Sequence, residues 1–273
     1  MVLLDMLRQQ PGIKLTVAHY DHGIREDSSE DRRLVQEVAA RHGLPFVYAH
    51  GELGPDASEA AARDARYAFL RRVRRATGAR SIITAHHQDD LLETVIMNIL
   101  RGTGRKGLSP LTSLNDLHRP LLNVPKHFLI RHAHDNQLLW REDSTNADLK
   151  YHRNYVRHSI LPNVHEEAKN QLLEMAEKQA RINQEIDTLL VNQLHFQDKR
   201  DALGRAWFLS LPHAVAKEVL ASWLRSHRLI DFDRRSLDRL VIGAKVSPPG
   251  KTLDVIKNHQ LHIQPKYLSL KKA

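Results

Sequence analysis

The sequence has no cysteine among its 273 residues, which excludes a disulfide scaffold, a thiolate zinc site and a cysteine nucleophile. It also has no apolar run near the ~20 residues that a membrane-spanning helix needs. The apolar start, residues 1–8, lacks the basic lead and the small-residue cleavage site of a secretory signal. We therefore expect a soluble, cytoplasmic protein with no membrane partner. At this length the chain can build one large hydrophobic core or two ordinary ones.

Positive charge is unevenly distributed along the chain, whose formal net charge is +9. Residues 151–273 carry 20 Lys and Arg against 13 Asp and Glu, whereas residues 1–150 carry 21 against 19. This asymmetry favours a polyanionic partner that binds mainly to the second half. A surface that is basic without such a partner is the alternative. A basic membrane-surface helix is disfavoured, because the charges are scattered and no helix is strongly one-sided.

Strand and helix patterns alternate through the first half. Strands separated by helices of about 12 or more residues predict a doubly wound parallel sheet, an α/β fold. Ligands of such sheets bind beyond the carboxyl ends of the strands. Two polar clusters, at 19–25 and 86–90, follow predicted strands directly and are expected at that edge. The predicted strands span 13–18, 44–49 and 81–85, and the predicted helices span 29–42, 57–77 and 90–100.

The pattern changes near residue 150. A helical stretch is predicted over 154–194, followed by shorter helices near 212–228 and 233–243. Alternating apolar and polar residues at 253–263 then predict a hairpin. We therefore expect two domains, an α/β domain over residues 1–150 and a mainly helical domain over residues 151–273.

One short segment gathers two histidines and three carboxylates: His86, His87, Asp89, Asp90 and Glu93. On a helix that begins at residue 89 or 90, Asp90, Glu93 and Met97 fall on the side opposite the apolar face. Acidic residues in a first turn are favoured by the helix dipole, so capping accounts for one carboxylate. Three carboxylates beside two histidines exceed what capping needs, and they indicate a binding or catalytic site.

The same residue types also suit a metal. Together with His19, Asp21 and His22, the cluster could form the His/Asp site of a two-metal hydrolase. Neither H-x-H-x-D-H nor H-E-x-x-H occurs, however, and among 18 histidines some fall close together by chance. We predict no protein-held metal site, and a metal-dependent hydrolase stays as an alternative.

A basic, glycine-rich loop follows the acidic cluster. Residues 101–108 read R-G-T-G-R-K-G-L, and such loops let backbone amides approach phosphate closely. The loop is no Walker A motif, and a helix cap followed by a turn is the alternative. Arg63, Arg66 and Tyr67, near the start of the helix 57–77, are expected near the strand ends and are further candidates for ligand contact.

Arg153 and Arg157 are four residues apart, so on a helix they share a face. There they could grip phosphates or a carboxylate together. Alternatively they could join a domain-linking ion-pair network, through Glu142 or Asp143.

At this point several blocks resemble one family, the tRNA(Ile)-lysidine synthetases. The segment A-H-H-Q-D-D-L-L-E-T at 85–94, followed by L-R-G-T-G-R-K-G-L at 100–108, is similar to the family's signature. The resemblance covers nearly all of residues 1–165. Further blocks agree in order: V-A-H-Y-D-H-G-I-R at 17–25, E-A-A-A-R-D-A-R-Y at 59–67, R-P-L-L at 119–122, D-S-T-N at 143–146 and Y-H-R-N-Y-V-R at 151–157.

The resemblance implies an ATP-pyrophosphatase domain, of the adenine-nucleotide α-hydrolase type, joined to tRNA-binding segments. Such a ligase uses ATP, with Mg2+ on its phosphates, to adenylate the C2 carbonyl of the wobble cytidine in tRNA(Ile) with a CAU anticodon. Free L-lysine then displaces AMP to give lysidine. A homodimer is left open.

The resemblance also implies roles for residues. Asp89, Asp90 and Glu93 would hold lysine or Mg2+, and His86 or His87 would be the base that the lysine amine requires. The expected ATP contacts are Ala18, His19, His22, Arg25, Arg63, Arg66, Arg101, Gly102 and Gly104. The expected tRNA contacts are Arg105, Lys106, Arg153, Asn154 and Arg157.

Two departures from the family's pattern stand out. Leu91 occupies a position where the family has Gln, and the S-G-G-x-D-S phosphate loop with its preceding strand is not found in these residues. We therefore expect the DNA upstream of Met1 to encode that loop, and the 273 residues alone to be impaired in ATP-dependent chemistry. A non-catalytic tRNA-binding remnant is the further alternative.

Overall fold

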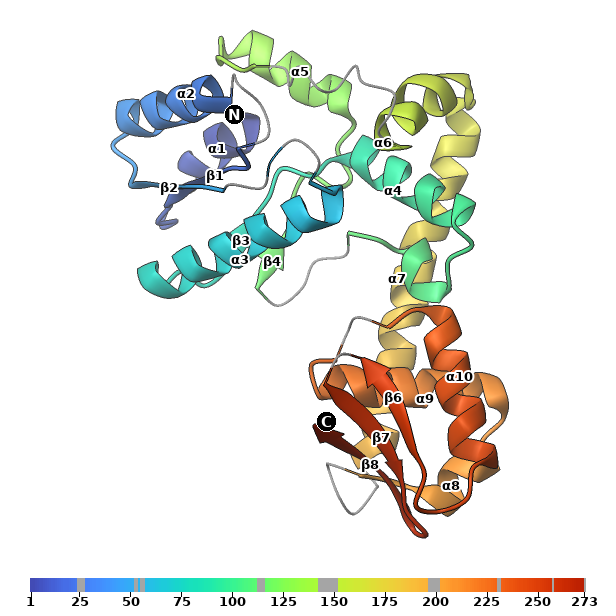
Figure 1. Cartoon of the computed structure of the whole chain (residues 1–273). Helices are drawn as coiled ribbons and strands as arrows, with labels where there is room; N and C mark the ends of the chain where they lie inside the picture. The colour runs from blue at the N-terminus through green and yellow to red at the C-terminus, as the bar shows by residue number, and fades with distance from the viewer. Residues whose placement is uncertain are drawn as a thin grey trace. The chain divides into compact units, whose positions relative to one another are not determined.

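The computed structural model describes residues 1–23, 28–51, 54, 57–111, 116–141, 152–195, 202–229, 232–256 and 258–272 (Figure 1). Their contacts form two compact units. Unit 1 comprises residues 1–103 and 107–176, and unit 2 comprises residues 104–106 and 177–273. The division falls within the long helix α7 (Glu166–His195), later than the boundary expected at residue 150. No helix among these residues is both long enough and apolar enough to cross a membrane.

Unit 1 contains parallel strand pairs, as the sequence predicts. Strand β1 (Val17–Asp21) pairs with β2 (Phe46–His50), and β3 (Ile82–Ile83) pairs with β4 (Leu117–His118). The connecting helices are α2 (Ser28–Arg41) and α3 (Glu59–Thr77). The expected α/β class is therefore confirmed, although no ladder joins the two pairs within the described residues.

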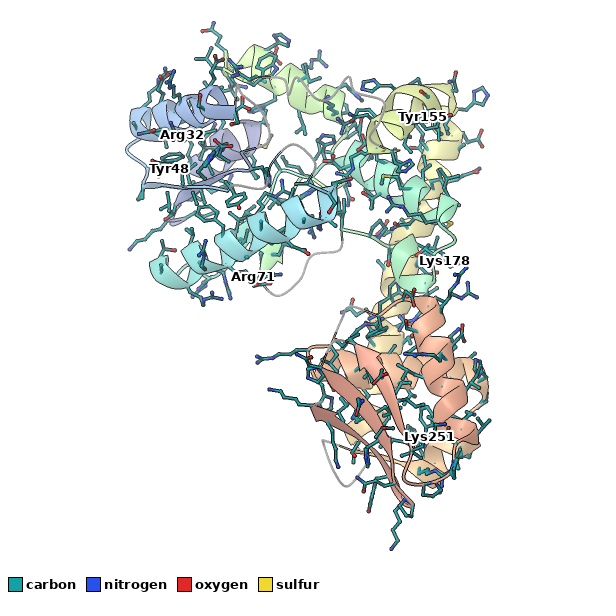
Figure 2. The ribbon with its side chains drawn as sticks, viewed as in Figure 1. Arg32, Tyr48, Arg71, Tyr155, Lys178 and Lys251 are labelled. Atoms are coloured by element: carbon teal, nitrogen blue, oxygen red, sulfur yellow. The ribbon has the colours of Figure 1, made fainter. Side chains whose placement is uncertain are left out.

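The strand limits differ from the prediction. The strand expected at 13–18 begins only at Val17, because pairing with β2 starts there, opposite Phe46. The strand expected at 81–85 shrinks to two residues, and β4 was not predicted. Helix α2 covers this region partly through a cation–π contact, in which the Arg32 guanidinium lies 4.9 Å from the Tyr48 ring centre (Figure 2).

Local capping signals fix the two helices that carry the site. The Ser58 hydroxyl accepts from the Ala61 amide at 3.2 Å to begin α3, and Gly78 ends it with φ +66°. Helix α4 (Gln88–Leu100) begins after His87, whose amide donates to Asp90 Oδ2 at 2.9 Å. The start of α4 is therefore one or two residues earlier than predicted.

The face of α4 that was expected to be polar is covered. Glu93 and Met97 are both buried. Met97 packs with Val156 and Leu161, and on another face Val95 packs with Ala176. Helical periodicity does not predict this burial, because residues more than 50 positions later in the chain pack over α4. They include α6 (His152–Tyr155), the π-helical segment Val156–Ile160 and the 3-10 turn Leu161–Asn163.

Unit 2 combines helices with an antiparallel sheet of order β5-β8-β7-β6. The predicted hairpin is confirmed as β6 (Thr252–Ile256) and β7 (His259–Ile263). The core centres on Phe208, Trp223 and Leu261. The remaining elements are β5 (Ala202–Gly204), α8 (Arg205–Ser210), α9 (His213–Ser226), α10 (Arg234–Val246) and β8 (Tyr267–Lys272).

A buried carboxylate joins helix α1 (Val2–Arg8) to α5 (Lys126–Asp135) in unit 1. Asp5 Oδ1 accepts from Arg8 at 2.6 Å, and Oδ2 lies 2.9 Å from His132 Nε2. Burial alone would raise the pKa of Asp5, but hydrogen bonds from His132, Arg8 and Gln9 outweigh burial and hold the pKa below its ordinary value.

We expect Asp5→Asn to cost about 1–3 kcal/mol of unfolding free energy near neutral pH, since it removes charged hydrogen bonds from a buried site. Because the folded-state pKa is depressed, this contribution is complete above the unfolded value of 3.8 and is lost as pH falls through the folded value. Urea unfolding between pH 6 and pH 3 tests this. Asp64→Asn, on the exposed side of α3, is the control. A cost that stays constant down to pH 3 would contradict the prediction.

Candidate functional site

At the carboxyl end of β1, the backbone at Gly23 packs directly against the backbone at Gly51. Asp21 is buried, and its Oδ1 accepts from the Gly23 amide at 2.9 Å while His50 Nδ1 lies 3.3 Å from Oδ2. Gly23 has φ +67°, and a Cβ there would overlap the Gly51 carbonyl. Within the described part of the first polar cluster, residues 19–23, the chain therefore ends β1 in a fixed turn. Ala18 and His19 lie on β1, His22 stacks edge-on with Tyr20 at 5.0 Å, and Arg25 lies outside the described residues.

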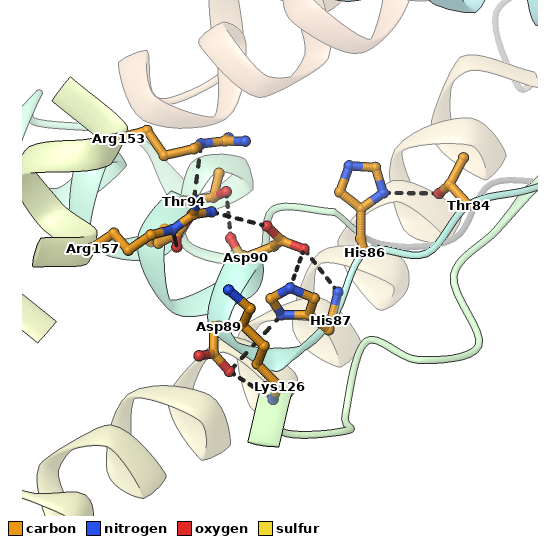
Figure 3. A network of polar contacts seen from close by, with 10 residues as sticks. Thr84, His86, His87, Asp89, Asp90, Thr94, Lys126, Arg153 and Arg157 are labelled. Atoms are coloured by element: carbon orange, nitrogen blue, oxygen red, sulfur yellow. Dashed lines mark hydrogen bonds and ion pairs between the residues drawn. The ribbon is translucent and has the colours of Figure 1, made fainter. Parts of the chain in front are cut away.

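The second polar cluster joins β3 to α4 (Figure 3). Thr84 Oγ1 lies 2.8 Å from His86 Nδ1, which fixes the orientation of that ring. Asp89 Oδ1 accepts from the Lys126 amide at 3.1 Å, and His87 Nε2 lies 3.5 Å from Asp90 Oδ2. The histidines and aspartates that the sequence singles out are thus brought together at the start of one helix.

A guanidinium grips the third carboxylate of this cluster. Arg157 Nε and Nη2 donate to the two oxygens of Glu93 at 2.6 and 3.1 Å, and Arg157 Nη2 lies 3.8 Å from Asp90 Oδ1. Glu93 has 0% of its surface exposed. Burial raises the pKa of Glu93, and the Arg157 hydrogen bonds oppose that rise. The geometry is the bidentate arrangement that is strongest for an arginine and a carboxylate.

Arg153 and Arg157 were expected either to bind phosphates or a carboxylate of a ligand, or to join an ion-pair network. The structure supplies carboxylate partners for such a network. Arg153 Nη2 lies 3.3 Å from Glu59 and its Nε 3.8 Å from Glu93. Asn154, between them, is buried. These carboxylates come from α3 and α4, while the expected partners at 142 and 143 lie outside the described residues. Contacts of Arg153, Asn154 and Arg157 with tRNA remain predictions.

His86 lies in a cationic environment. Burial lowers its pKa to about 4; Asp90 opposes the shift, and Arg119, Arg66 and Arg63 reinforce it. His86 is therefore neutral at physiological pH. A group with this pKa is a weak base toward an alkyl ammonium, whose ordinary pKa is about 10.4. The electrostatics argue against the general-base role expected for His86.

The glycine-rich loop is tied at both ends. Arg101 ends α4, Gly102 has φ +69°, and Asn98 Nδ2 donates to the Gly107 carbonyl at 2.9 Å. A Cβ on Gly107 would overlap the Thr103 side chain, whereas Gly104 has open space around it. The contacts of Arg101, Gly102 and Gly107 hold the two ends of the loop in place. They favour a helix cap followed by a turn over a mobile phosphate loop.

Arg105 and Lys106, whose contacts with tRNA remain predictions, bind polar side chains within unit 2, to which both residues belong. Arg105 donates to Glu218 Oε2, Asn183 Oδ1 and Asp187 Oδ1, each at 2.9 Å. Lys106 Nζ lies 2.9 Å from Asp187 Oδ2. Nothing local in the sequence marks these partners, because they lie about 80 to 110 positions later. Their hydrogen bonds leave less of both cations available to a phosphate.

Sequence reasoning singled out Tyr67 but missed Arg119, and both residues are buried in unit 1. Arg119 donates to the Leu111 carbonyl at 2.9 Å, and its Nη2 lies 3.4 Å from the Tyr67 hydroxyl. Both belong to blocks that carry the family resemblance, and a cation beside a proline in R-P-L-L was the available signal. Among the residues that the structure describes, no group of three or more His, Asp or Glu side chains could hold a metal ion.

Comparison with known proteins identifies relatives of the chain. A family model described as PP-loop domain matches residues 1–164. The tRNA(Ile)-lysidine synthase of Thermus thermophilus is 39% identical over 279 residues, covering 97% of this chain and 54% of that protein. The tRNA(Ile)-lysidine synthase of Solibacter usitatus is 32% identical over 265 residues, covering 91% and 59%. The chain thus spans about half the length of the curated relatives it matches.

A solved structure supports the fold. The U34-tRNA thiolase NcsA from Methanococcus maripaludis aligns with a TM-score of 0.53 and 17% identity, covering 66% of this chain and 67% of that one. At this identity the likeness concerns the architecture alone.

We expect Gly23→Ala to destabilise the protein by about 2–4 kcal/mol, through a positive φ and an overlap with the Gly51 backbone. Gly43→Ala is the matched control, since Gly43 also has a positive φ, +63°, but open space around it. The control should cost only about 1 kcal/mol. Chemical denaturation of both variants measures the difference, and equal costs would contradict a packed turn at Gly23.

We expect Arg157→Ala to cost about 3–5 kcal/mol of unfolding free energy, because it leaves the Glu93 carboxylate buried without its main partner. Adding Glu93→Gln to that variant should restore part of the loss, since a neutral amide is cheaper to bury. Denaturant unfolding of both variants measures this. If the double variant is as unstable as Arg157→Ala, the charge of Glu93 is not the cause.

Proposed function

Because the chain belongs to the PP-loop domain family, we propose that it catalyses the ATP-dependent ligation of free L-lysine to C2 of the wobble cytidine of tRNA(Ile) with a CAU anticodon. Relatives named tRNA(Ile)-lysidine synthase, at 32% and 39% identity, support the assignment. The observation that carries it is the cluster of Asp90, Glu93 and Arg157, in which Arg157 lies within 3.8 Å of both carboxylates. Such a cluster presents both signs of charge in one place.

A free amino acid needs both signs, since it carries ammonium and carboxylate groups. Asp90 supplies the negative charge that attracts an ammonium. The Arg157 guanidinium, held in place by the buried Glu93, supplies the positive charge that attracts a carboxylate. The cluster lies at the start of α4, directly after β3, which is the edge where ligands of parallel sheets bind. We therefore assign lysine to this cluster.

ATP lies at the neighbouring strand end in this proposal. Asp89 is partly exposed, and carboxylate oxygens are the ligands that Mg2+ prefers, so Asp89 fits a magnesium ion on the ATP phosphates. When bound, the ion would neutralise phosphate charge. The residues assigned to the nucleotide are Ala18, His19, His22, Arg25, Arg63, Arg66, Arg101, Gly102 and Gly104.

Two transfers make up the proposed reaction. First, the C2 carbonyl oxygen of the cytidine attacks the α-phosphorus of ATP, and pyrophosphate leaves. Then the ε-amine of lysine attacks C2, and AMP leaves with that oxygen. The amine must lose a proton before it attacks. His87, 3.5 Å from Asp90, is the favoured acceptor, because the low pKa of His86 makes that residue a weak base.

Residues 1–150 select lysine and ATP in this proposal, and residues 151–273 contribute most of the affinity for tRNA. The second half carries the larger excess of Lys and Arg, and phosphate neutralisation dominates binding to nucleic acids. Arg105, Lys106 and Arg157 already hold carboxylates, so we assign the larger share of phosphate contacts to other cations, within residues 151–273.

In a chain extended upstream by the expected S-G-G-x-D-S loop, we expect Asp90→Asn to lower lysine affinity and the rate of lysidine formation by about 100-fold or more. The neutral amide keeps the shape but loses the charge that attracts an ammonium. Calorimetric titration with L-lysine and mass spectrometry of the tRNA nucleosides measure the two effects separately. Glu37→Gln, exposed on α2, is the control that removes one carboxylate elsewhere.

Retention of near-normal lysine binding by Asp90→Asn would show that this carboxylate only caps α4. Binding of tRNA(Ile) by the extended protein without the Asp90→Asn change, with neither lysine binding nor turnover, would favour the non-catalytic remnant instead.

A further inference from the structure

One side of α5 carries exposed imidazole and guanidinium groups. His127, Arg131 and His134 are four and three residues apart, so they share this side of the helix, and all three are exposed. The helix packs inward through Leu129 and Ala133, which are buried. The three polar side chains therefore form a solvent-facing surface of unit 1.

An exposed ring lies at each end of this surface. In the first turn of α5, Phe128 is 51% exposed, and its ring centre lies 4.3 Å from that of His127. After the last turn, Trp140 is 40% exposed and meets His134 edge-on at 4.9 Å. Aromatic rings interleaved with cations are typical of surfaces that bind unpaired nucleic acid. We call the set His127, Phe128, Arg131, His134 and Trp140 the α5 row.

The α5 row has little negative charge near it in the sequence. Between Lys126 and Arg141 the chain has one carboxylate, Asp135. Arg141 pairs with carboxylates of α2, whereas among the described residues Arg131 has no carboxylate within 4 Å. This surface therefore favours a partner that brings negative charge.

Two hydrogen bonds join the start of α5 to the start of α4, which carries the candidate site. The Lys126 amide donates to Asp89 Oδ1 at 3.1 Å (Figure 3), and the Gln88 amide donates to the Val124 carbonyl at 3.1 Å. The first ring pair of the α5 row follows Lys126 directly in the sequence, so it lies within one helical turn of this junction. At 1.5 Å per residue, the helix then leads about 12 Å away from the site.

We propose that the α5 row binds the unpaired nucleotides next to the target cytidine, with Phe128 and Trp140 stacking on bases and Arg131 contacting a phosphate. An enzyme that modifies a base takes it out of its stack, and a neighbouring base that loses its partner gains one on an exposed ring. This assignment rests on the proposed function, because it takes the target nucleotide to lie at the start of α4. It adds an RNA surface on α5 to the contacts expected at residues 105–106 and 153–157.

The test is the affinity of the purified chain for a short RNA hairpin with a CAU loop, measured without ATP or lysine. Phe128→Leu and Trp140→Leu keep an apolar side chain but remove the ring. We expect each to weaken hairpin binding by about fivefold or more, because stacking on one base is lost. Trp140→Phe keeps a ring and should stay within about threefold. So should the matched control Tyr48→Leu, which removes a half-exposed ring from β2.

A fully paired RNA duplex of the same length separates stacking from charge. Paired bases cannot stack on a side chain, so the two leucine variants should bind the duplex as the unaltered chain does. Arg131→Gln should lower the slope of log affinity against log salt for the hairpin by about 0.7, which corresponds to one phosphate contact. If the leucine variants bind the hairpin as Tyr48→Leu does, or lose as much affinity for the duplex, the proposal is overturned.

Photocrosslinking of the unaltered chain avoids variants that change its shape. A hairpin with 5-bromouridine beside the target cytidine should crosslink to a peptide that contains Phe128 or Trp140, as mass spectrometry of the digest would show. Crosslinks confined to other segments would overturn the proposal. Crosslinking at the α5 row, in a protein that forms no lysidine after extension upstream, would count against the proposed reaction and leave the RNA surface standing. Lysidine formation with no effect of either leucine variant on RNA binding would do the reverse.

Discussion

Burial of the Glu93 carboxylate imposes the tightest constraint on unit 1. A buried carboxylate keeps its charge only with a close cationic partner, and Arg157 provides two hydrogen bonds from a segment 64 positions later. The turns over 152–163 must therefore fold against α4 before the cluster has its charge pattern. The same contact covers Met97 with Val156, so apolar packing and the ion pair stabilise one arrangement.

Much of the α/β architecture could be predicted because its signals are local. Strand–helix alternation, the end of α3 at Gly78 and the hairpin of β6 and β7 each depend on a few neighbouring residues. The prediction was wrong where distant packing decides. Strand β1 starts at Val17 because its partner does, and one face of α4 is covered by segments that helical periodicity cannot reveal.

The candidate site divides in the same way. The cluster from His86 to Glu93 could be found because its members are adjacent in sequence and begin one helix. Arg119 could not be found, because its partner Tyr67 lies 52 positions earlier in the sequence. Arg105 shows the converse. A basic loop suggests a phosphate site until Asp187 and Glu218, which are distant in sequence, are seen to neutralise it.

The π-helical winding of Val156–Ile160 has a consequence for which changes this region can accept. Such a wide turn holds one residue more than an α-helical turn, and it arises naturally by insertion into an α-helix. Deleting a single residue there would restore α-helical winding and rotate the flanking residues by about 100° relative to each other. Arg157 would then turn away from Glu93 although no side chain of the pair had changed. The number of residues in this segment, independently of their identity, therefore keeps Arg157 paired with the Glu93 carboxylate of α4.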